Sequence, residues 1–386
     1  MSTVVVSAKG AARWRHGHPW IYRSDVVTTG KAPPGPVRVT DRSGRFLGQA
    51  LYSPASEIRL RLLTREEEPL DQAWWRSRVD AAAARRAGLR GDATAYRVVH
   101  AEGDGLPSLV VDRYGDIVVA QILSAGLEAV RPLLLQAIQD ALQPQGVLLR
   151  NDASVRRHEG LPLEIVEVAG SVPETVEVRE GGVRYLVSPR DGQKTGAFLD
   201  QRENRLLVGR LAQGDALDVF TYQGLFALHA AARCSRVLAV DSSAAALAGA
   251  QRNAELNGCG NVEWREANAF DLLRALEREA AAFGTIVLDP PAFAKQKSSL
   301  SRAVAGYKEI NLRAMRLLAP GGVLFTASCS FHVSRAAFLD MLADAAADSG
   351  RRVVLERVTG QSSDHPELLS VPETGYLKGA VLRALD

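Results

Sequence analysis

The second half of the chain alternates short apolar strands with helices rich in alanine and leucine, and this pattern restricts the possible folds more than any other feature. The expected strands 216–220, 236–241 and 285–291 are apolar along nearly their whole length, and helices such as 244–257 and 302–319 follow them. Strands of this kind are buried on both faces, and their alternation with helices is typical of a parallel sheet covered by helices on each side. From residue 189 onward we therefore expect an α/β domain with a doubly wound sheet.

Two smaller regions precede this domain. Residues 67–188 mix strands with helices and predict an α+β domain, with one helix within 66–93, Pro69 in its first turn, and a second helix over 127–142. Residues 1–66 contain short strands separated by Gly and Pro, which indicates a small barrel or sandwich. The strands expected there are 4–6, 36–41, 46–53 and 57–64.

The net charge of +3 is unevenly distributed along the chain. Residues 1–65 carry eleven Lys and Arg against three Asp and Glu, a net charge of +8, so the rest of the chain is mildly acidic. A basic block on an acidic body is typical of a nucleic-acid-binding appendage, and the alternative is a surface rich in Arg because of base composition. Within this block Trp20 and Tyr22 either stack on bases or pack inside, and we favour packing.

Features that the chain lacks disfavour several classes of protein. It has no run of about 18 apolar residues, and its first residues do not form a signal peptide, so we expect no membrane partner. Its three cysteines, Cys234, Cys259 and Cys329, are scattered and fit neither a disulfide framework nor a zinc site. We therefore expect a cytoplasmic protein that holds no metal.

In a doubly wound sheet the ligand binds beyond the carboxyl ends of the strands, where we expect the loop 221–226, Asp241 and Asn268. Asp241 would accept hydrogen bonds from ribose hydroxyls, and the amide of Asn268 would read an adenine edge. The loop has one glycine, whereas a dinucleotide requires a GxGxxG turn for its pyrophosphate. This favours a nucleoside without phosphates, such as S-adenosylmethionine, although many α/β domains with this pattern bind other ligands or none.

Two further strand ends carry reactive side chains. Asp289 is followed by Pro290 and Pro291, which fix the chain and remove two backbone donors, so that a carboxylate can be held against a flat base; the alternative is a simple turn. Cys329 is the one cysteine expected at the ligand-binding edge. Thiolate addition at C6 of a pyrimidine makes C5 nucleophilic enough to take a methyl group, so Cys329 is either a nucleophile or a packing residue.

Several motifs resemble those of the large-subunit ribosomal RNA cytosine-C5 methyltransferase family. The most specific is DGQKTGAFLDQRENR at 191–205, and LDVFTYQGLFALHAA at 217–231, LDPPAF at 288–293 and SCS at 328–330 agree with it. Shorter motifs extend the resemblance over nearly the whole chain: HPWIY at 18–22, YSPASEIRLR at 52–61, GDGLPSLVVDRYGD at 103–116, DHPE at 364–367 and YLKG at 376–379.

The resemblance implies three domains: a PUA RNA-binding domain over 1–66, a central α+β domain over 67–188, and a Rossmann-like class I methyltransferase domain over 189–386. It implies that S-adenosylmethionine is the cofactor and that large-subunit ribosomal RNA is the partner, and related chains suggest a homodimer. Cys329 is implied to be the nucleophile, and Asp289 the group that hydrogen-bonds the N3 side of the pyrimidine.

The resemblance also implies which residues hold the cofactor. Asp241 would bind the ribose, and the segment 193–200 would close over the methionine end. The complete implied set is Gln193, Lys194, Thr195, Gly196, Phe198, Asp200, Phe220, Tyr222, Gly224, Asp241, Ser242, Asn268, Ala269, Asp289 and Pro290.

The chain departs from the family pattern at two of these places. The first cofactor loop, usually closer to YTGGF, reads YQGLF at 222–226, and Asn268 stands where the family often has Asp. We expect both changes to weaken cofactor binding without removing the chemistry. The alternatives are C5 methylation of uracil or of another RNA, a small-molecule methyltransferase, which the basic block disfavours, and a non-catalytic RNA-binding assembly factor, which Asp289 and Cys329 disfavour.

Overall fold

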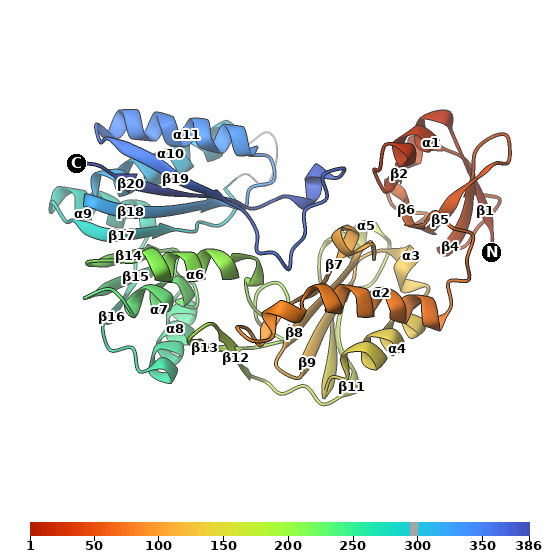
Figure 1. Ribbon diagram of the computed structural model, residues 1–386, viewed down its shortest axis with the longest axis horizontal. Helices are drawn as coiled ribbons and strands as arrows, with labels where there is room; N and C mark the ends of the chain where they lie inside the picture. The colour runs from red at the N-terminus through yellow and green to blue at the C-terminus, as the bar shows by residue number, and fades with distance from the viewer. Residues whose placement is uncertain (294–299) are drawn as a thin grey trace. The chain divides into compact units, whose positions relative to one another are not determined.

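The computed structural model describes residues 1–293 and 300–386, and the chain forms two compact units (Figure 1). Unit 1 comprises Met1–Val178, Val187–Leu199 and Ser363–Thr374, and unit 2 comprises Arg179–Leu186, Asp200–Ser362 and Gly375–Asp386. The expected domain boundaries after residues 66 and 188 stay a prediction. Each unit is described by itself below.

The N-terminal part of unit 1 is a six-stranded sheet of order β2-β6-β5-β4-β1-β3. Its strands are β1 (Thr3–Val6), β2 (Trp20–Tyr22), β3 (Val26–Thr28), β4 (Gly35–Thr40), β5 (Phe46–Tyr52) and β6 (Ile58–Thr64). The four predicted strands correspond to β1, β4, β5 and β6. The sequence does not predict helix α1 (Ala8–Arg15), which has Gly10 inside it. A Cβ on Gly10 would lie 3.2 Å from the Cβ of Asp25, so a larger residue there would require Asp25 to shift by a few tenths of an ångström.

The second part of unit 1 is a five-stranded sheet of order β11-β10-β9-β8-β7. Its strands are β7 (Ala95–His100), β8 (Leu109–Tyr114), β9 (Ile117–Ile122), β10 (Gly146–Asn151) and β11 (Glu164–Gly170). Helix α2 (Gln72–Arg85) packs against helix α4 (Arg131–Leu142) in one hydrophobic core, and the short helices are α3 (Ala125–Glu128) and α5 (Val155–His158).

Two expectations for this region are wrong in detail. Asp71 caps α2 by accepting a hydrogen bond from the backbone N–H of Trp74 at 3.0 Å, so Pro69 precedes the helix instead of lying in its first turn. The single helix expected over 127–142 is broken into α3 and α4, because Pro132 lies in the first turn of α4 and cannot continue a preceding helix.

Unit 2 is built on a seven-stranded sheet of order β16-β15-β14-β17-β18-β20-β19, preceded by the hairpin β12 (Val176–Glu180) and β13 (Val183–Val187), whose tip belongs to the unit. Five neighbouring strands run parallel, whereas β20 is antiparallel to both of its neighbours. The expectation of a wholly parallel sheet is therefore wrong at this edge. The strands are β14 (Ala216–Val219), β15 (Val237–Asp241), β16 (Val262–Glu266), β17 (Phe283–Leu288), β18 (Leu318–Ser328), β19 (Val353–Thr359) and β20 (Lys378–Ala384).

Helices cover both faces of this sheet, as predicted (Figure 1). One face carries α9 (Ala269–Arg278), α10 (Leu300–Arg316) and α11 (Arg335–Ser349), and the other carries α6 (Arg202–Leu211), α7 (Leu225–Ala231) and α8 (Ala244–Asn257). The chain runs from β14 through β15 to β16, and the next crossover returns to β17 on the other side of β14. The strand order therefore reverses beside β14, and the carboxyl ends of the strands at such a point form the ligand-binding edge of these folds.

Candidate functional site

The residues predicted from strand ends do follow neighbouring strands of unit 2. Asn268 comes after β16, Asp241 ends β15, Phe220 follows β14, Asp289 follows β17, and Cys329 follows β18. These five strands are parallel and adjacent, so all five residues lie at one edge of the sheet. The other two cysteines follow helices α7 and α8 and are remote from strand ends of this polarity.

The loop after β14 has an unusual backbone. Phe220 and Tyr222 have φ angles of 67° and 49°, and Gly224 has a φ of 78°. Left-handed backbone at two non-glycine aromatic residues is uncommon and is found preferentially at functional sites, where surrounding contacts hold it in place. One such contact comes from Asp241, whose Oδ2 accepts a hydrogen bond from the backbone N–H of Tyr222 at 2.9 Å. The loop and the neighbouring strand end therefore form one fixed structure.

Gly224 is required by its neighbours as well as by its conformation. A Cβ at this position would lie 2.6 Å from the indole ring of Trp264 and 3.0 Å from the Cβ of Ala250. The glycine, which ends the loop and begins helix α7, thus permits close packing of the loop on β16 and α8. The second glycine of the family pattern is replaced here by Leu225, and Gln223 stands where the pattern has Thr. The Oε1 atom of Gln223 is buried without a hydrogen-bond partner among the described residues.

Asp241 is oriented to accept further hydrogen bonds. Its two carboxylate oxygens accept from the backbone N–H groups of Tyr222 and Ser243, each at 2.9 Å, and the side chain is half-buried. A carboxylate offers about four acceptor positions, so two remain for the hydroxyls of a ribose. Ser242, the other predicted residue of this loop, is exposed beside it.

Asn268 caps helix α9 with its side chain. Its Oδ1 accepts hydrogen bonds from the backbone N–H groups of Phe270 and Asp271 at 3.0 and 3.3 Å, and Ala269 is the first helical residue. Since the amide oxygen is occupied by the cap, the Nδ2 group is the part of Asn268 left to meet an adenine. An acceptor for the adenine amino group is therefore not supplied by this side chain.

Four aromatic rings form a cluster beside these loops. Phe293, which follows the two prolines, lies 6.4 Å from Phe220, 6.0 Å from Phe270 and 4.6 Å from Tyr307, measured between ring centroids. Aromatic side chains offer apolar faces to planar ligands. Phe270 and Tyr307 are not predicted as site residues from the sequence, because aromatics in helices usually belong to a core, whereas Phe293 ends the LDPPAF motif.

Asp289 is held by a short relay of amides. Gln201 donates a hydrogen bond from Nε2 to Oδ1 of Asp289 at 2.7 Å, and its own Oε1 accepts from Nδ2 of Asn204 at 2.6 Å. The same Nδ2 group donates to the carbonyl of Gly360 at 3.0 Å. Gln201 and Asn204 are buried, so the Oδ1 atom of Asp289 is held in place by side chains of the protein interior. Gln201 and Asn204 both lie in the 191–205 motif, so the resemblance marks this segment as part of the site without giving these two residues a role.

Cys329 lies between two buried serines in the loop after β18 and is itself half-buried. Tyr307 connects this loop to the one that carries Asp289. Its hydroxyl lies 2.9 Å from Oγ of Ser330 and 3.4 Å from the carbonyl oxygen of Pro291, which accepts from it. Burial raises the pKa of Tyr307, and negative charge on Cys329 acts in the same direction. The thiol and the carboxylate thus stand on two loops joined by one phenol.

A third carboxylate is buried behind this edge. Asp218, in β14, accepts hydrogen bonds from Oγ1 of Thr221 at 2.5 Å and from the N–H of Ala227 at 3.0 Å, while its Oδ1 has no partner among the described residues. Burial raises the pKa of Asp218 to about 7, and the negative charges of Asp289 and Asp241 raise it as well. Asp218 is not predicted as a site residue, because a single acidic residue inside a buried strand gives no indication of function in the sequence.

The predicted segment 193–200 divides between the two units. In unit 1, Thr195 is buried, donates to Oδ2 of Asp112 at 2.5 Å, and lies 2.9 Å from the hydroxyl of Tyr114. The ammonium of Lys194 lies 4.6 Å from the centre of the Phe198 ring, Gln193 is exposed, and Gly196 has a φ of 145°.

In unit 2, Asp200 is buried and accepts from the hydroxyl of Tyr376 at 2.6 Å. Its backbone carbonyl accepts from the N–H of Ser362 at 2.8 Å. These contacts fix the start of the segment that leads into Gln201.

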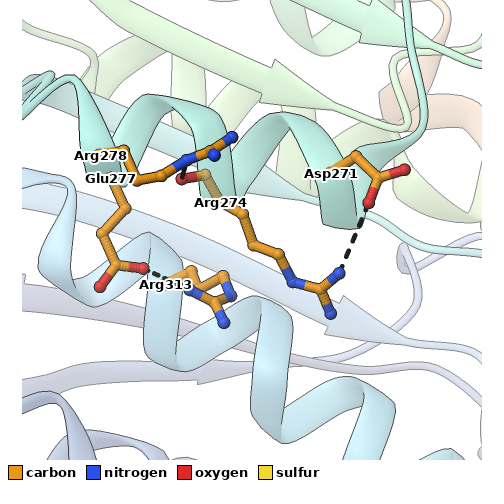
Figure 2. A pocket seen from close by; sticks show the side chains of 5 residues that line it. All are labelled: Asp271, Arg274, Glu277, Arg278 and Arg313. Atoms are coloured by element: carbon orange, nitrogen blue, oxygen red, sulfur yellow. Dashed lines mark hydrogen bonds and ion pairs between the residues drawn. The ribbon is translucent and has the colours of Figure 1, made fainter.

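A surface hollow of about 710 Å³ lies on helices α9 and α10 and is lined by Asp271, Arg274, Glu277, Arg278 and Arg313 (Figure 2). Its charges pair with one another, as the contacts Arg274–Asp271 and Arg313–Glu277 show, and it contains none of the predicted site residues. Within residues 1–293 and 300–386, no group of three His, Cys, Asp or Glu is placed to hold a metal ion, and no helix is long and apolar enough to cross a membrane.

The residues at the strand edge fit a nucleoside that carries no phosphate. Asp241 has acceptors for ribose hydroxyls, the aromatic cluster offers apolar faces for a base, and the loop after β14 lacks the run of glycines that a pyrophosphate requires. S-adenosylmethionine has this chemistry.

Comparisons with known proteins agree with this reading. Residues 4–65 match a family described as PUA-like domain, and residues 97–382 match a family described as S-adenosylmethionine-dependent methyltransferase. Ribosomal RNA large subunit methyltransferase I of Erwinia tasmaniensis is 39% identical over 396 residues, which cover 100% of both chains. The protein of the same name from Aeromonas hydrophila is 41% identical over 378 residues, which cover 95% of each chain.

Two solved structures share the fold over the whole chain. A proposed SAM-dependent methyltransferase from Streptococcus mutans has a TM-score of 0.82 at 20% identity, covering 99% of this chain and 100% of that one. A proposed methyltransferase complexed with SAH has a TM-score of 0.83 at the same identity of 20%, again covering 99% and 100% of the two chains.

Proposed function

Because the chain belongs to the family of S-adenosylmethionine-dependent methyltransferases that includes ribosomal RNA large subunit methyltransferase I, we propose that it methylates C5 of a cytosine in large-subunit ribosomal RNA. Family membership confirms the expected fold class, with its PUA-like and Rossmann-like parts, and the expected cofactor. The choice of RNA, of cytosine and of C5 belongs to the proposal.

One observation carries the proposed chemistry. Strands β17 and β18 are hydrogen-bonded neighbours, with Leu288 paired to Thr326, so Asp289 and Cys329 follow adjacent strand ends. Tyr307 joins their two loops. A fixed carboxylate beside a cysteine is the pair that methyl transfer to a pyrimidine C5 requires, because C5 is a poor nucleophile until a thiolate has added to C6.

The proposed reaction uses the two side chains in turn. The Cys329 thiolate forms a bond to C6, and the C5–C6 π electrons are delocalised through C4 towards N3. There the Asp289 carboxyl group, in its protonated form, donates a hydrogen bond and stabilises the negative charge that develops. S-adenosylmethionine supplies the methyl group, which C5 takes as the sulfonium–methyl bond breaks. Loss of the C5 proton to a base then restores the C5–C6 double bond and expels the thiolate of Cys329.

Other residues have supporting roles in this proposal. Gln201, held by Asn204, orients Asp289, and Asp241 binds the ribose of the cofactor. The basic N-terminal block supplies affinity for RNA phosphates. A cytoplasmic location and a homodimer remain predictions from the sequence and its resemblance.

The proposal is tested by mapping methylated nucleosides in ribosomal RNA from cells with and without the protein. We expect loss of one 5-methylcytidine from the large-subunit RNA, and its return when the purified protein and S-adenosylmethionine are added. Loss of 5-methyluridine would reassign the base, and loss of methylation in another RNA would reassign the substrate. An unchanged methylation map would favour the non-catalytic alternative.

A further inference from the structure

The YLKG motif at 376–379 places a buried lysine beside the loop that carries Cys329. Lys378 begins β20, pairs with Ser328 in the antiparallel ladder between β18 and β20, and is 4% exposed. Its Nζ donates hydrogen bonds to the carbonyl of Ser330 at 2.7 Å and to the carbonyl of Tyr376 at 2.8 Å. The ammonium group is therefore fixed at the residue that follows Cys329.

This ammonium lacks the partner that a buried lysine ordinarily has. Among the described residues, no carboxylate lies within ion-pair distance of Lys378, and the two carbonyl oxygens only partly replace the water that it loses. The charged groups that act on it are Cys329, which attracts it when ionised, and the guanidinium of Arg335 at the start of α11, which repels it. Burying such a cation costs free energy unless an opposite charge compensates it, and an ionised Cys329 would supply that charge.

The pKa of Lys378 agrees with an electrostatic interaction between its ammonium group and Cys329. Burial lowers the pKa of this ammonium to about 8, and Cys329 acts in the opposite direction. At neutral pH Lys378 is therefore mainly an ammonium, which is the form that attracts an ionised Cys329.

We propose that Lys378 is a positioning residue that stabilises the thiolate form of Cys329 and holds its loop through the carbonyl of Ser330. The proposal deepens the proposed function, since it rests on Cys329 being the nucleophile. A lysine suits this role better than a neutral donor, which would hold the loop equally well but would leave the cysteine as an unreactive thiol. Among the described residues, the phenol of Tyr307 and the guanidinium of Arg335 also act electrostatically on this pair.

The first test is the pH dependence of Cys329 alkylation by iodoacetamide, read peptide by peptide by mass spectrometry in the full-length protein. For Lys378→Gln we expect the midpoint of the profile to rise by about one pH unit or more, and alkylation at pH 7 to fall about tenfold. Lys308→Gln is the matched control, because Lys308 pairs with Asp348 on the surface, and Cys259 in each sample is an internal control. An unchanged Cys329 profile in a folded Lys378→Gln protein would overturn the proposal.

A second measurement keeps the lysine in place, in case Lys378→Gln fails to fold. The chain has seven lysines, so the Lys378 side chain can be followed by NMR with carbon-13 labelling at Cε. Since coupling between two titrating groups is reciprocal, the midpoint of Lys378 titration should fall in Cys329→Ala, and an unchanged midpoint would contradict the proposal. Neither test requires methyl transfer. A protein that shows both shifts but forms no 5-methylcytidine would sink the proposed function alone.

Discussion

At the scale of single residues, the site depends on side chains that hold other side chains. Gln201 contacts Asp289 through Nε2, and Asn204 fixes the other end of Gln201. Removing such a support leaves the carboxylate of Asp289 in the protein but allows it to rotate. We therefore expect Gln201 to contribute to turnover and not to cofactor binding.

We predict that Gln201→Ala lowers kcat by about 10²-fold, because small misplacements of a catalytic group have effects of this size. Calorimetric affinity for S-adenosylhomocysteine should stay within a factor of two. A matched control is Gln213→Ala, which removes an exposed amide that donates to the carbonyl of Gly321, away from the strand edge that carries Asp289. If Gln201→Ala weakened cofactor binding instead of turnover, the relay would have to be reinterpreted as part of the cofactor site.

Asp218 gives the stability of unit 2 a dependence on pH. Its pKa is about 7 in the folded protein and near 3.9 in an unfolded chain, so the folded state holds a proton that the unfolded state releases. The stabilisation is complete below about pH 4 and is lost as the pH rises towards 7. Asp218→Asn imitates the protonated acid at every pH. We predict that the melting temperature falls less between pH 5 and 7.5 in Asp218→Asn than in the wild type, which thermal scans at the two pH values would measure.

At the scale of elements, the sequence predicts most of the sheet but not all of its helices. The strands β14, β15, β17 and β18 are recognisable because they are apolar runs that alternate with helices. Helix α6 is not predicted, because its buried face includes Arg202 and Arg205, which look like surface residues. The sequence also does not predict that β20 is antiparallel to its neighbours, since a buried strand has the same apolar pattern in either orientation.

The site was predictable to a similar extent. Residues at strand ends, such as Asp241, Asp289 and Cys329, follow from the rule that parallel strands end at one edge. Residues that reach this edge from elsewhere in the chain, such as Gln201 and Lys378, do not follow from any strand-end pattern, and only the structure shows what they contact.

The buried salt bridge between Arg205 of α6 and Glu180 makes the stability of unit 2 depend on pH. Arg205 forms two hydrogen bonds to the buried Glu180, at 2.7 and 2.6 Å, and His229 lies 3.0 Å from the same carboxylate. Burial alone would raise the pKa of Glu180, but Arg205 and His229 outweigh it and hold the value at about 2. The stabilisation from this carboxylate is therefore present at neutral pH and is lost as the pH falls from about 4.5 towards 2.

We predict that Glu180→Gln lowers the free energy of unfolding by about 3–5 kcal/mol at pH 7, because it leaves the Arg205 cation buried without its counter-charge. Denaturant titration would measure the loss. Glu263→Gln serves as the control, since Glu263 pairs with Arg236 and Arg265 near the surface, where ion pairs contribute little. Equal losses from the two substitutions would contradict a special role for the buried pair.

At the scale of the whole molecule, the charge is divided between a basic N-terminal sheet and an acidic remainder. Trp20 and Tyr22 are half-buried in this sheet, and the indole N–H of Trp20 donates to Glu102 at 2.9 Å, which agrees with the preference for packing over stacking on RNA. Affinity for RNA is then expected to come mainly from exposed basic side chains such as Arg42 and Arg45.

We predict that the double variant Arg42→Ala/Arg45→Ala binds ribosomal RNA more weakly than the wild type. The slope of log affinity against log salt should decrease by about 0.7 for each phosphate contact that is lost. The control is Arg274→Ala/Arg278→Ala, which removes two arginines from the hollow of Figure 2 in unit 2. Filter-binding titrations at several salt concentrations would show the difference, and a larger effect from the control pair would place the RNA surface elsewhere.

The proposed chemistry depends on covalent addition of Cys329 to the target pyrimidine. RNA that carries 5-fluorocytosine at the target position tests it most directly, because fluorine at C5 cannot leave as a proton and the adduct therefore accumulates after methyl transfer. We predict a crosslink on denaturing gels with the wild type and with Cys234→Ala and Cys259→Ala. We predict none with Cys329→Ala, which should still bind RNA and cofactor. A Cys329→Ala protein that methylates its RNA, or a crosslink that maps to another residue, would contradict the account.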